Sequence, residues 1–193
     1  MRKFLAKWGL RHWINLCLGS GLLLFAIACT PLDRPSIPAS LNSRYTDEQP
    51  ALSGDGRYVA FVSNRDGSRH LLLYDLQAQV LLPLPGLQDR PEVIAESPSI
   101  SYTGRYIVCI INDQGRPSLV LYDRVTQQRQ FLSRWYQGWI RNPSISPDGR
   151  YIAVESSING QWDIEVLDRG SRIELDIPDG VPIEEHKLQT SSD

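Results

Sequence analysis

The stretch "PSISPDGRYIAVES", residues 143–156, decides the fold because the chain presents its pattern twice before reaching it. The related stretches are "PALSGDGRYVAFVS" at residues 50–63 and "PSISYTGRYIVCII" at residues 98–111. Their Gly-Arg-Tyr tripeptides begin at residues 56, 104 and 149, so one unit is roughly 45 residues long. Repetition at such a period indicates an array of structural repeats, each packed on the next.

A second landmark follows each tripeptide at a constant distance. The tyrosine is followed 17 residues later by an aspartate, which is Asp75, Asp123 or Asp168. Because the aspartate recurs in every unit, we expect it to have a structural role and to accept hydrogen bonds from the amides of a hairpin turn. The arginines of the tripeptides are expected to cover apolar edges with their stems.

Each unit predicts four short strands separated by turn residues. The first strand precedes the Gly-Arg-Tyr turn, the second follows it, the third ends at the aspartate, and the fourth comes next. In the third unit these strands are residues 142–146, 151–156, 163–168 and 171–177. Asn, Asp and Gly between the second and third strands suit tight hairpins because they tolerate positive φ.

Several of the second and third strands are apolar almost throughout, as in "YVAFVS", "YIVCII" and "HLLLYD". A strand with one wet face alternates between apolar and polar residues, whereas a strand covered on both faces is continuously apolar. Four-stranded sheets of this length, covered on both faces, predict a stack of propeller blades. The blades are expected at about residues 50–90, 97–135 and 142–178.

The spaced pattern resembles the WD40-like repeats, also called PD40 repeats, of the TolB-like β-propellers. The residues that carry the resemblance are "PSISPDGRYIAVES" with "WDIEVLD", "PALSGDGRYVAFVSNRDG" with "LLLYDL", and "PSISYTGRYIVCIINDQG" with "LVLYD". It covers roughly residues 41–178 and implies an all-β fold of about three four-stranded antiparallel blades. The second unit departs from the family pattern, because Tyr102-Thr103 replaces Pro-Asp.

Three blades are too few for a ring, since closed propellers have 4–8. We therefore expect an open, partial propeller, with residues 41–45 available as one stray outer strand. In the third unit, Asp163 and Glu165 alternate with Trp162, Ile164 and Val166. This alternation predicts that the end sheet turns a polar face to solvent, as a terminal repeat requires. The alternative is simply a more polar blade.

The first 28 residues have the form of an export signal. Four basic residues precede an apolar run from Ile14 to Ala28, which is shorter than the roughly 20 residues of a membrane-spanning helix. The run ends in "FAIAC", which resembles the bacterial lipoprotein signal and implies acylation of Cys29. Cleavage without lipid, or an uncleaved anchor, is the alternative. Residues 29–40 are predicted to be the lipidated cysteine and a flexible tether, and residues 179–193 a polar tail.

Charge and cysteine content narrow the class of protein further. The chain has 20 basic and 22 acidic residues, and four of the basic ones fall within the first 28. The rest carries a net charge of about −6, which argues against nucleic acid as a partner because phosphates need a basic surface. Beyond Cys17 and Cys29 only Cys109 is left, in "RYIVCII", where we expect a small buried apolar residue.

The sequence carries no convincing catalytic or metal-binding pattern. His70 opens a strand and His186 lies in the polar tail, so neither is near a nucleophile turn. HxxxH and CxxC spacings are absent, and the Asn and Asp residues of "SNRDGS" and "INDQGR" fit hairpins better than calcium loops. We therefore expect no enzyme activity, no metal and no cofactor.

A binding surface is expected at the end of the blades opposite the Gly-Arg-Tyr turns, where the units differ. The loops between second and third strands and the links between blades emerge there. Aromatic residues beside arginine are typical of binding anchors, and filling of the wedge between widening blades is an equal alternative for these rings. The candidates are Asn64, Arg65, Asp66, Asn112, Asp113, Arg134, Trp135, Tyr136, Trp139 and Arg141.

These observations predict an exported lipoprotein that is held to a membrane by lipid on Cys29 and faces the periplasm or the cell exterior. TolB-like domains serve in envelope protein complexes, so the resemblance implies a protein partner, with a glycan as the other ligand class. Together with the lack of a catalytic pattern, this predicts a non-catalytic binding or scaffold module. One alternative is a structural subunit that completes its propeller with another chain, for example by self-association through an open blade edge. The other is the accessory propeller of a separate peptidase system.

Overall fold

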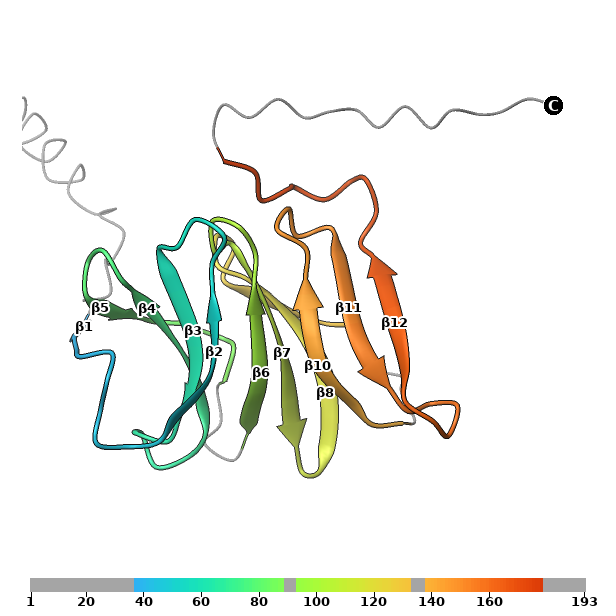
Figure 1. Cartoon of the computed structure of the whole chain (residues 1–193), viewed down its shortest axis with the longest axis horizontal. Coiled ribbons are helices and arrows are strands. Elements are labelled where there is room, and N and C mark those ends of the chain that lie inside the picture. Colours follow the sequence, from blue (N-terminus) through green and yellow to red (C-terminus); the bar gives the residue numbers. More distant parts are fainter. Residues whose placement is uncertain (1–36, 89–92, 133–137, 179–193) are drawn as a thin grey trace, which may run out of the picture. The chain divides into compact units, whose positions relative to one another are not determined.

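Three antiparallel β-sheets lie side by side in the computed structural model, which describes residues 37–88, 93–132 and 138–178 (Figure 1). The strand order is β1-β5-β4-β3-β2 in the first sheet, β6-β7-β8-β9 in the second and β10-β11-β12 in the third. The three sheets do not close into a ring. The prediction of an all-β fold of three stacked, open sheets is therefore confirmed.

The strands fall close to the positions that the repeats predict. The first sheet contains β1 (Ile37–Pro38), β2 (Asp47–Leu52), β3 (Tyr58–Ser63), β4 (His70–Asp75) and β5 (Val80–Leu82). The second contains β6 (Ile94–Ile100), β7 (Tyr106–Asp113), β8 (Arg116–Asp123) and β9 (Gln128–Phe131). The third contains β10 (Ile140–Ile145), β11 (Tyr151–Ser156) and β12 (Asp163–Asp168).

The constant interval between tyrosine and aspartate is the register of one hairpin. Tyr58 pairs directly with Asp75, and the same pairing joins β7 to β8 and β11 to β12. Since the tyrosine begins one strand and the aspartate ends the next, a fixed register requires a fixed interval between them.

A bulge bends the strand that precedes the Gly-Arg-Tyr turn in each sheet. The residue before the proline has a positive φ, 53° at Gln49, 51° at Ser97 and 50° at Asn142. The pairing of β2, β6 and β10 with the next strand shifts at these positions. A bulge of this kind increases local twist and re-aims the strand. The repeat pattern alone did not predict it.

Two apolar cores hold the three sheets together. The first lies between the first and second sheets and includes Leu73, Ile107 and Cys109. The second lies between the second and third sheets and includes Val108 and Ile152. Alternate residues of β7 enter the two cores, which explains why that strand is apolar throughout.

Cys109 is fully buried in the first core, as predicted. Burial raises the pKa of its thiol to about 12, so the group stays protonated and behaves as a small apolar side chain.

Three details differ from the sequence predictions. Residues 41–45 form no strand, and the extra outer strand is β1, which pairs with β5. Residues 171–177 form no fourth strand in the third sheet. The third sheet was also predicted to turn its acidic face to solvent, and this is wrong. Glu165 pairs with Val154, a buried residue of the second core, so the acidic side of β12 is turned toward the second sheet.

The segment after β12 leaves its sheet because it completes the turn of the second unit. Thr103 stands where the other two turns have Asp55 and Asp148. The carboxylate of Asp176 takes over that role, accepting hydrogen bonds from Ser101 Oγ at 2.5 Å, from the Thr103 amide at 2.8 Å and from the Thr103 hydroxyl. This buried carboxylate holds the segment at a turn of the second sheet. A segment held there cannot also lie alongside β12 as a fourth strand.

Candidate binding surfaces

The recurring aspartate and arginine form a structural unit. Asp75 Oδ1 accepts hydrogen bonds from the Gln77 and Ala78 amides at 2.9 Å, and Oδ2 accepts two from Arg57. Burial would raise the pKa of Asp75, but these hydrogen bonds outweigh it and lower the pKa. Asp123 and Asp168 make the same kinds of contact. The prediction of a turn-stabilising role is confirmed, and this end of the sheets is not a candidate site.

The predicted loop residues of the first sheet hold the chain in place. Arg65 donates to Asp47 at 2.8 Å and to the Leu41 carbonyl at 3.2 Å, and Asn64 Oδ1 accepts from the Thr46 amide at 3.1 Å. Asp66 is exposed beside them. Arg65 and Asn64 therefore fasten the segment before β2 to the β3–β4 loop, which explains them without a ligand.

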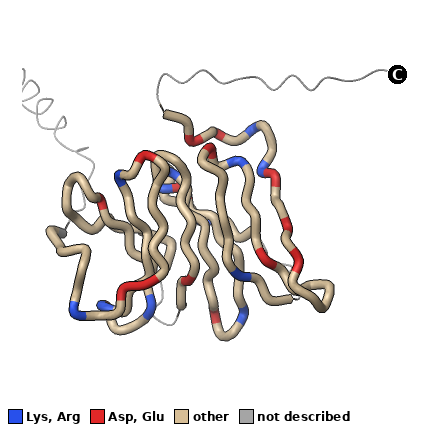
Figure 2. The backbone as a smooth tube through the Cα atoms, in the orientation of Figure 1, with Lys and Arg blue, Asp and Glu red and all other residues tan. Residues whose placement is uncertain are grey.

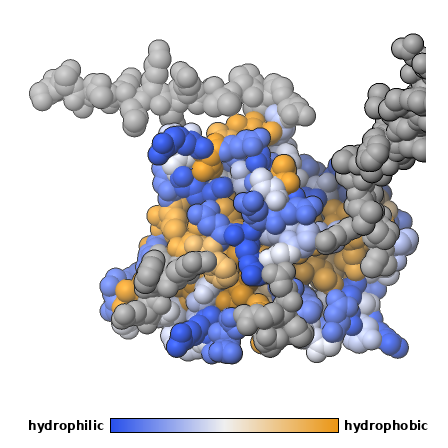
Figure 3. All heavy atoms as spheres, turned by 180° about the vertical axis from the view of Figure 1, so that it is seen from behind, coloured by the Kyte–Doolittle hydropathy of each residue, from blue (hydrophilic) through white to orange (hydrophobic). Residues whose placement is uncertain are grey.

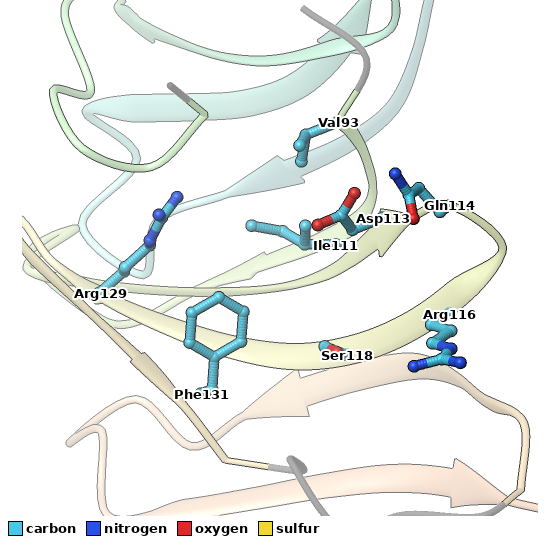
Figure 4. A pocket seen from close by; sticks show the side chains of 8 residues that line it. All are labelled: Val93, Ile111, Asp113, Gln114, Arg116, Ser118, Arg129 and Phe131. Carbon is cyan, nitrogen blue, oxygen red and sulfur yellow. The ribbon is translucent and has the colours of Figure 1, made fainter. Parts of the chain in front are cut away.

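Asp113, at the end of β7, instead lines a cavity of about 420 Å³ (Figure 4). Asn112, the candidate that precedes it, is not among the residues that line this cavity. Its apolar wall consists of Val93, Ile111 and Phe131. The polar lining consists of Asp113, Gln114, Arg116, Ser118 and Arg129. Of the predicted candidates, the structure thus places Asp113 in a cavity with acidic, basic and aromatic walls.

One side of this cavity is fixed by Arg129. Its guanidinium donates to the Leu87 carbonyl at 2.9 Å and lies 5.5 Å from the centre of the Phe131 ring. The site is therefore built from β7, β8 and β9 together with the residue before β6. One signal in the sequence points to it: β8 begins "RPS" before its apolar run, and polar residues at the start of a buried strand mark where the packing opens.

The aromatic link between the second and third sheets is only partly described. Arg134, Trp135 and Tyr136 lie outside the described residues. Trp139 is 61% exposed, and its amide donates to Ser157 Oγ at 2.9 Å. Arg141 Nε donates to Glu155 at 2.6 Å, and the Arg141 guanidinium lies 3.9 Å from the centre of the Trp162 ring. Trp162 is thus part of a surface with Arg141, although the sequence did not single it out as a binding residue.

These residues belong to the side of the third sheet turned away from the second, called here the free face. Arg141 pairs with Glu155, which in turn pairs with Ile164, so the three share one side of the sheet. Ile164 is 69% exposed and Val166 64%. We define the free face by Trp139, Arg141, Tyr151, Trp162, Ile164 and Val166.

Charge is distributed unevenly over the sheets. Charged residues gather near the strand ends, whereas β12 carries acidic residues along its length (Figure 2). From behind, apolar areas show between hydrophilic ones (Figure 3). The described ranges contain no cluster of three or more His, Cys, Asp or Glu residues suited to a metal ion, and no helix there has the length and apolarity to cross a bilayer.

Comparison with known proteins identifies the architecture. No protein-family model and no curated protein sequence matches the chain. Among solved structures, TolB from Acinetobacter baumannii superposes with a TM-score of 0.57 at 23% identity, covering 67% of this chain and 31% of that one. A protein assigned as TolB from Agrobacterium tumefaciens gives a TM-score of 0.51 at 18% identity, covering 72% of this chain and 50% of that one.

The chain matches half or less of the length of these TolB structures. The likeness at this level of identity concerns the fold alone. The three sheets therefore have the fold of part of a TolB-type β-propeller.

Proposed function

We propose that this chain is a non-catalytic, lipid-anchored module of the bacterial cell envelope that binds a partner protein. The cavity beside Asp113 is the observation that carries the proposal. It combines an apolar floor with an acid and two arginines, the mixture that holds an apolar side chain while hydrogen bonding the polar groups around it. The likeness to TolB supports a role in envelope complexes, and the "FAIAC" signal supports the anchor.

A peptide segment is the ligand that best fits this lining. Phe131 and Ile111 offer contact area to an apolar side chain, while Asp113 and Arg116 stand on the rim at the β7–β8 hairpin (Figure 4). Arginine and aromatic residues are enriched among the residues that dominate protein interfaces. A glycan is the second ligand class, because aromatic rings and carboxylates also suit sugars.

The binding role is tested by photo-crosslinking in membranes. A photoreactive amino acid replaces Arg116 in the full chain, and the matched control carries it at Val125, which is exposed in the β8–β9 turn. We expect a protease-sensitive adduct of defined mass at position 116 and none at position 125. Identical adducts at both positions, or no adduct at position 116, would contradict a site beside Asp113. A protease-resistant adduct would favour a glycan over a protein.

The anchor is tested separately by metabolic labelling with an alkyne-tagged fatty acid. The full chain is expected to take up the label and to remain with the membrane fraction after a high-salt wash. Cys29→Ala is expected to lose both properties, because the thiol is the attachment point. Persistence of the label in Cys29→Ala, or an unlabelled parent chain, would remove the anchor from the proposal.

A further inference from the structure

One contact is repeated at both junctions between the sheets. At the first junction the ring of Tyr58 lies against Gly104 of the next sheet, so closely that a Cβ at 104 would be 2.7 Å from the ring. Arg124 of that sheet covers the ring at 4.3 Å and donates to the Gly104 carbonyl at 2.9 Å. A tyrosine of one sheet is thus held between a glycine and an arginine of the next.

The second junction has the same arrangement. The Tyr106 ring lies against Gly149, where no Cβ would fit. Arg169 covers the ring at 4.2 Å and donates to the Gly149 carbonyl at 2.5 Å. Tyr58 and Tyr106 are consequently buried.

At each end of the described array, one side of this contact is present without its partner: the tyrosine at the third sheet and the glycine at the first. Tyr151, the third tyrosine, is 43% exposed. Gly56, the first glycine, has open space where a Cβ would be, although its φ of 72° matches the other two. Leu76, at the position of Arg124 and Arg169, is an exposed leucine.

We propose that the free face of the third sheet binds the outer side of the first sheet of a second copy of this chain. Tyr151 of one copy would lie against Gly56 and Leu76 of the other, reproducing the internal junctions. Two copies joined head to tail at both ends would place six sheets around one axis, within the 4–8 of closed propellers. Such a heterologous contact closes into a ring when its rotation fits.

The chemistry of both sides favours this occupant. On the free face, Arg141 pairs with Glu155 and Arg150 with Asp168, so its ions are already paired and Tyr151, Ile164 and Val166 are left to be covered. A partner for this face must therefore be mainly apolar.

The outer side of the first sheet meets that requirement. Leu52 is 59% exposed and pairs with Val59, which lines a hollow of about 180 Å³ with Phe61 and Leu41. Tyr58 and Ala60, which alternate with Val59, face the second sheet, so Leu52 and Val59 lie on the outer side. Asn42, Asp47 and Glu48 also line the hollow, and the two carboxylates are already paired with Arg65 and Arg69. Both surfaces thus combine exposed apolar side chains with ions that are already paired, and one offers the tyrosine where the other offers the glycine.

The inference is tested by the mass of the purified full chain in detergent, measured by sedimentation over a range of concentrations. A dimer that dissociates on dilution is expected. Val166→Arg places a charge in the apolar contact and is expected to leave a monomer whose thermal melt equals that of the wild type diluted to a monomer. Val125→Arg, the same substitution on an exposed valine away from both surfaces, is expected to leave the dimer intact. A monomer at every concentration, or a dimer indifferent to Val166→Arg, would overturn the proposal.

Leu76→Arg supplies a gain-of-function test. It restores the arginine of the internal junctions, and roughly 4- to 25-fold tighter association is expected, because the closed dimer contains two such contacts and each exposed cation–π contact is worth about two- to fivefold. The gain must disappear in the double variant with Tyr151→Ala, because Tyr151 is the ring to be covered. An undiminished gain in the double variant, or none in Leu76→Arg, would contradict the contact. Because the chain is measured alone, this result is independent of whether the Asp113 cavity binds a protein.

Discussion

At the residue scale, the aspartate that ends the third strand of each unit joins a strand, a turn and an arginine. Asp75 does so with its side chain only 3% exposed, whereas the side chain of Asp168 is 45% exposed. The contacts are alike in kind, but water can replace those of Asp168 far more easily than those of Asp75.

Asp75→Ala is expected to lower the free energy of unfolding by about 1–3 kcal/mol, because two turn amides and Arg57 lose their acceptor in a buried place. Asp168→Ala is the matched control and is expected to cost clearly less. Urea unfolding followed by circular dichroism measures both. Equal losses would mean that burial does not determine how much this carboxylate contributes to the free energy of unfolding.

Asp47 makes stability depend on pH. Burial alone would raise its pKa, but hydrogen bonds from Ser63, Arg65 and Ser43 lower it to about 2 from 3.8. A pKa that is lower in the folded than in the unfolded chain stabilises the fold above the unfolded value, and the gain is lost as pH falls toward 2. The free energy of unfolding of the wild type is expected to be about 1–2 kcal/mol higher than that of Asp47→Asn at pH 6. This difference is expected to shrink as the pH falls to 2. A gap independent of pH in urea titrations would refute this.

At the element scale, the turn of the second unit is completed from outside its own sheet. The Asp55 carboxylate bonds Ser53 and the Arg57 amide within one turn, and Asp148 does the same in the third unit. Thr103 cannot, so Asp176 supplies the carboxylate from residues that follow β12. The loss of one turn residue therefore changes the course of a distant segment.

Thr103→Asp is expected to release residues 171–178 at neutral pH, since its carboxylate would satisfy the turn and repel Asp176. Trypsin cleavage after Arg172 provides the measurement and is expected to become faster. Thr103→Asp combined with Asp176→Asn removes the repulsion and should slow cleavage again. Cleavage at the wild-type rate in Thr103→Asp would show that Asp176 does not hold the segment.

The strands were predictable from the sequence where local signals decide them. The Gly-Arg-Tyr turn and the 17-residue register are local, so β7, β8, β11 and β12 appear where expected. The stretch "SRIELDI" also has a strand-like pattern, but a buried hydrogen bond to another sheet overrides it. The alternation in β12 predicted which residues share a side of the third sheet, but not which of the two sides the second sheet covers.

The candidate site was predictable to a smaller extent. Asp113 followed from the order of strands and loops in a sheet. Phe131 and Ile111 did not, because whether they line a cavity depends on how far neighbouring sheets separate at that level. The same reasoning selected Arg65, whose contacts with Asp47 and Leu41 involve a segment without any repeat signal.

At the scale of the whole molecule, the described sheets form a row with two junctions and two ends. Tyr106 lies inside a junction and is 2% exposed, while Tyr151 occupies the equivalent place at an end. The same residue type in the same turn thus has a different environment only because of its place in the row.

Tyr106→Ala is expected to cost about 3–5 kcal/mol, as for other large buried aromatic residues, because it empties a space between two sheets. Tyr151→Ala is expected to change the stability of the single chain by less than about 0.5 kcal/mol. Thermal and urea unfolding at concentrations low enough for a monomer measure both. Similar losses for the two variants would indicate that Tyr151 is covered by the chain itself.

The missing fourth strand of the third sheet bears on solubility. Within the described ranges, β12 pairs only with β11, so one edge of β12 presents unpaired backbone groups beside Ile164 and Val166. Such an edge invites aggregation, and acidic residues are among the devices that suppress it. Asp163, Glu165 and Asp168 would bring six carboxylates together if two such edges met. Mutual repulsion between these carboxylates therefore protects this edge against pairing with a second copy of itself at neutral pH.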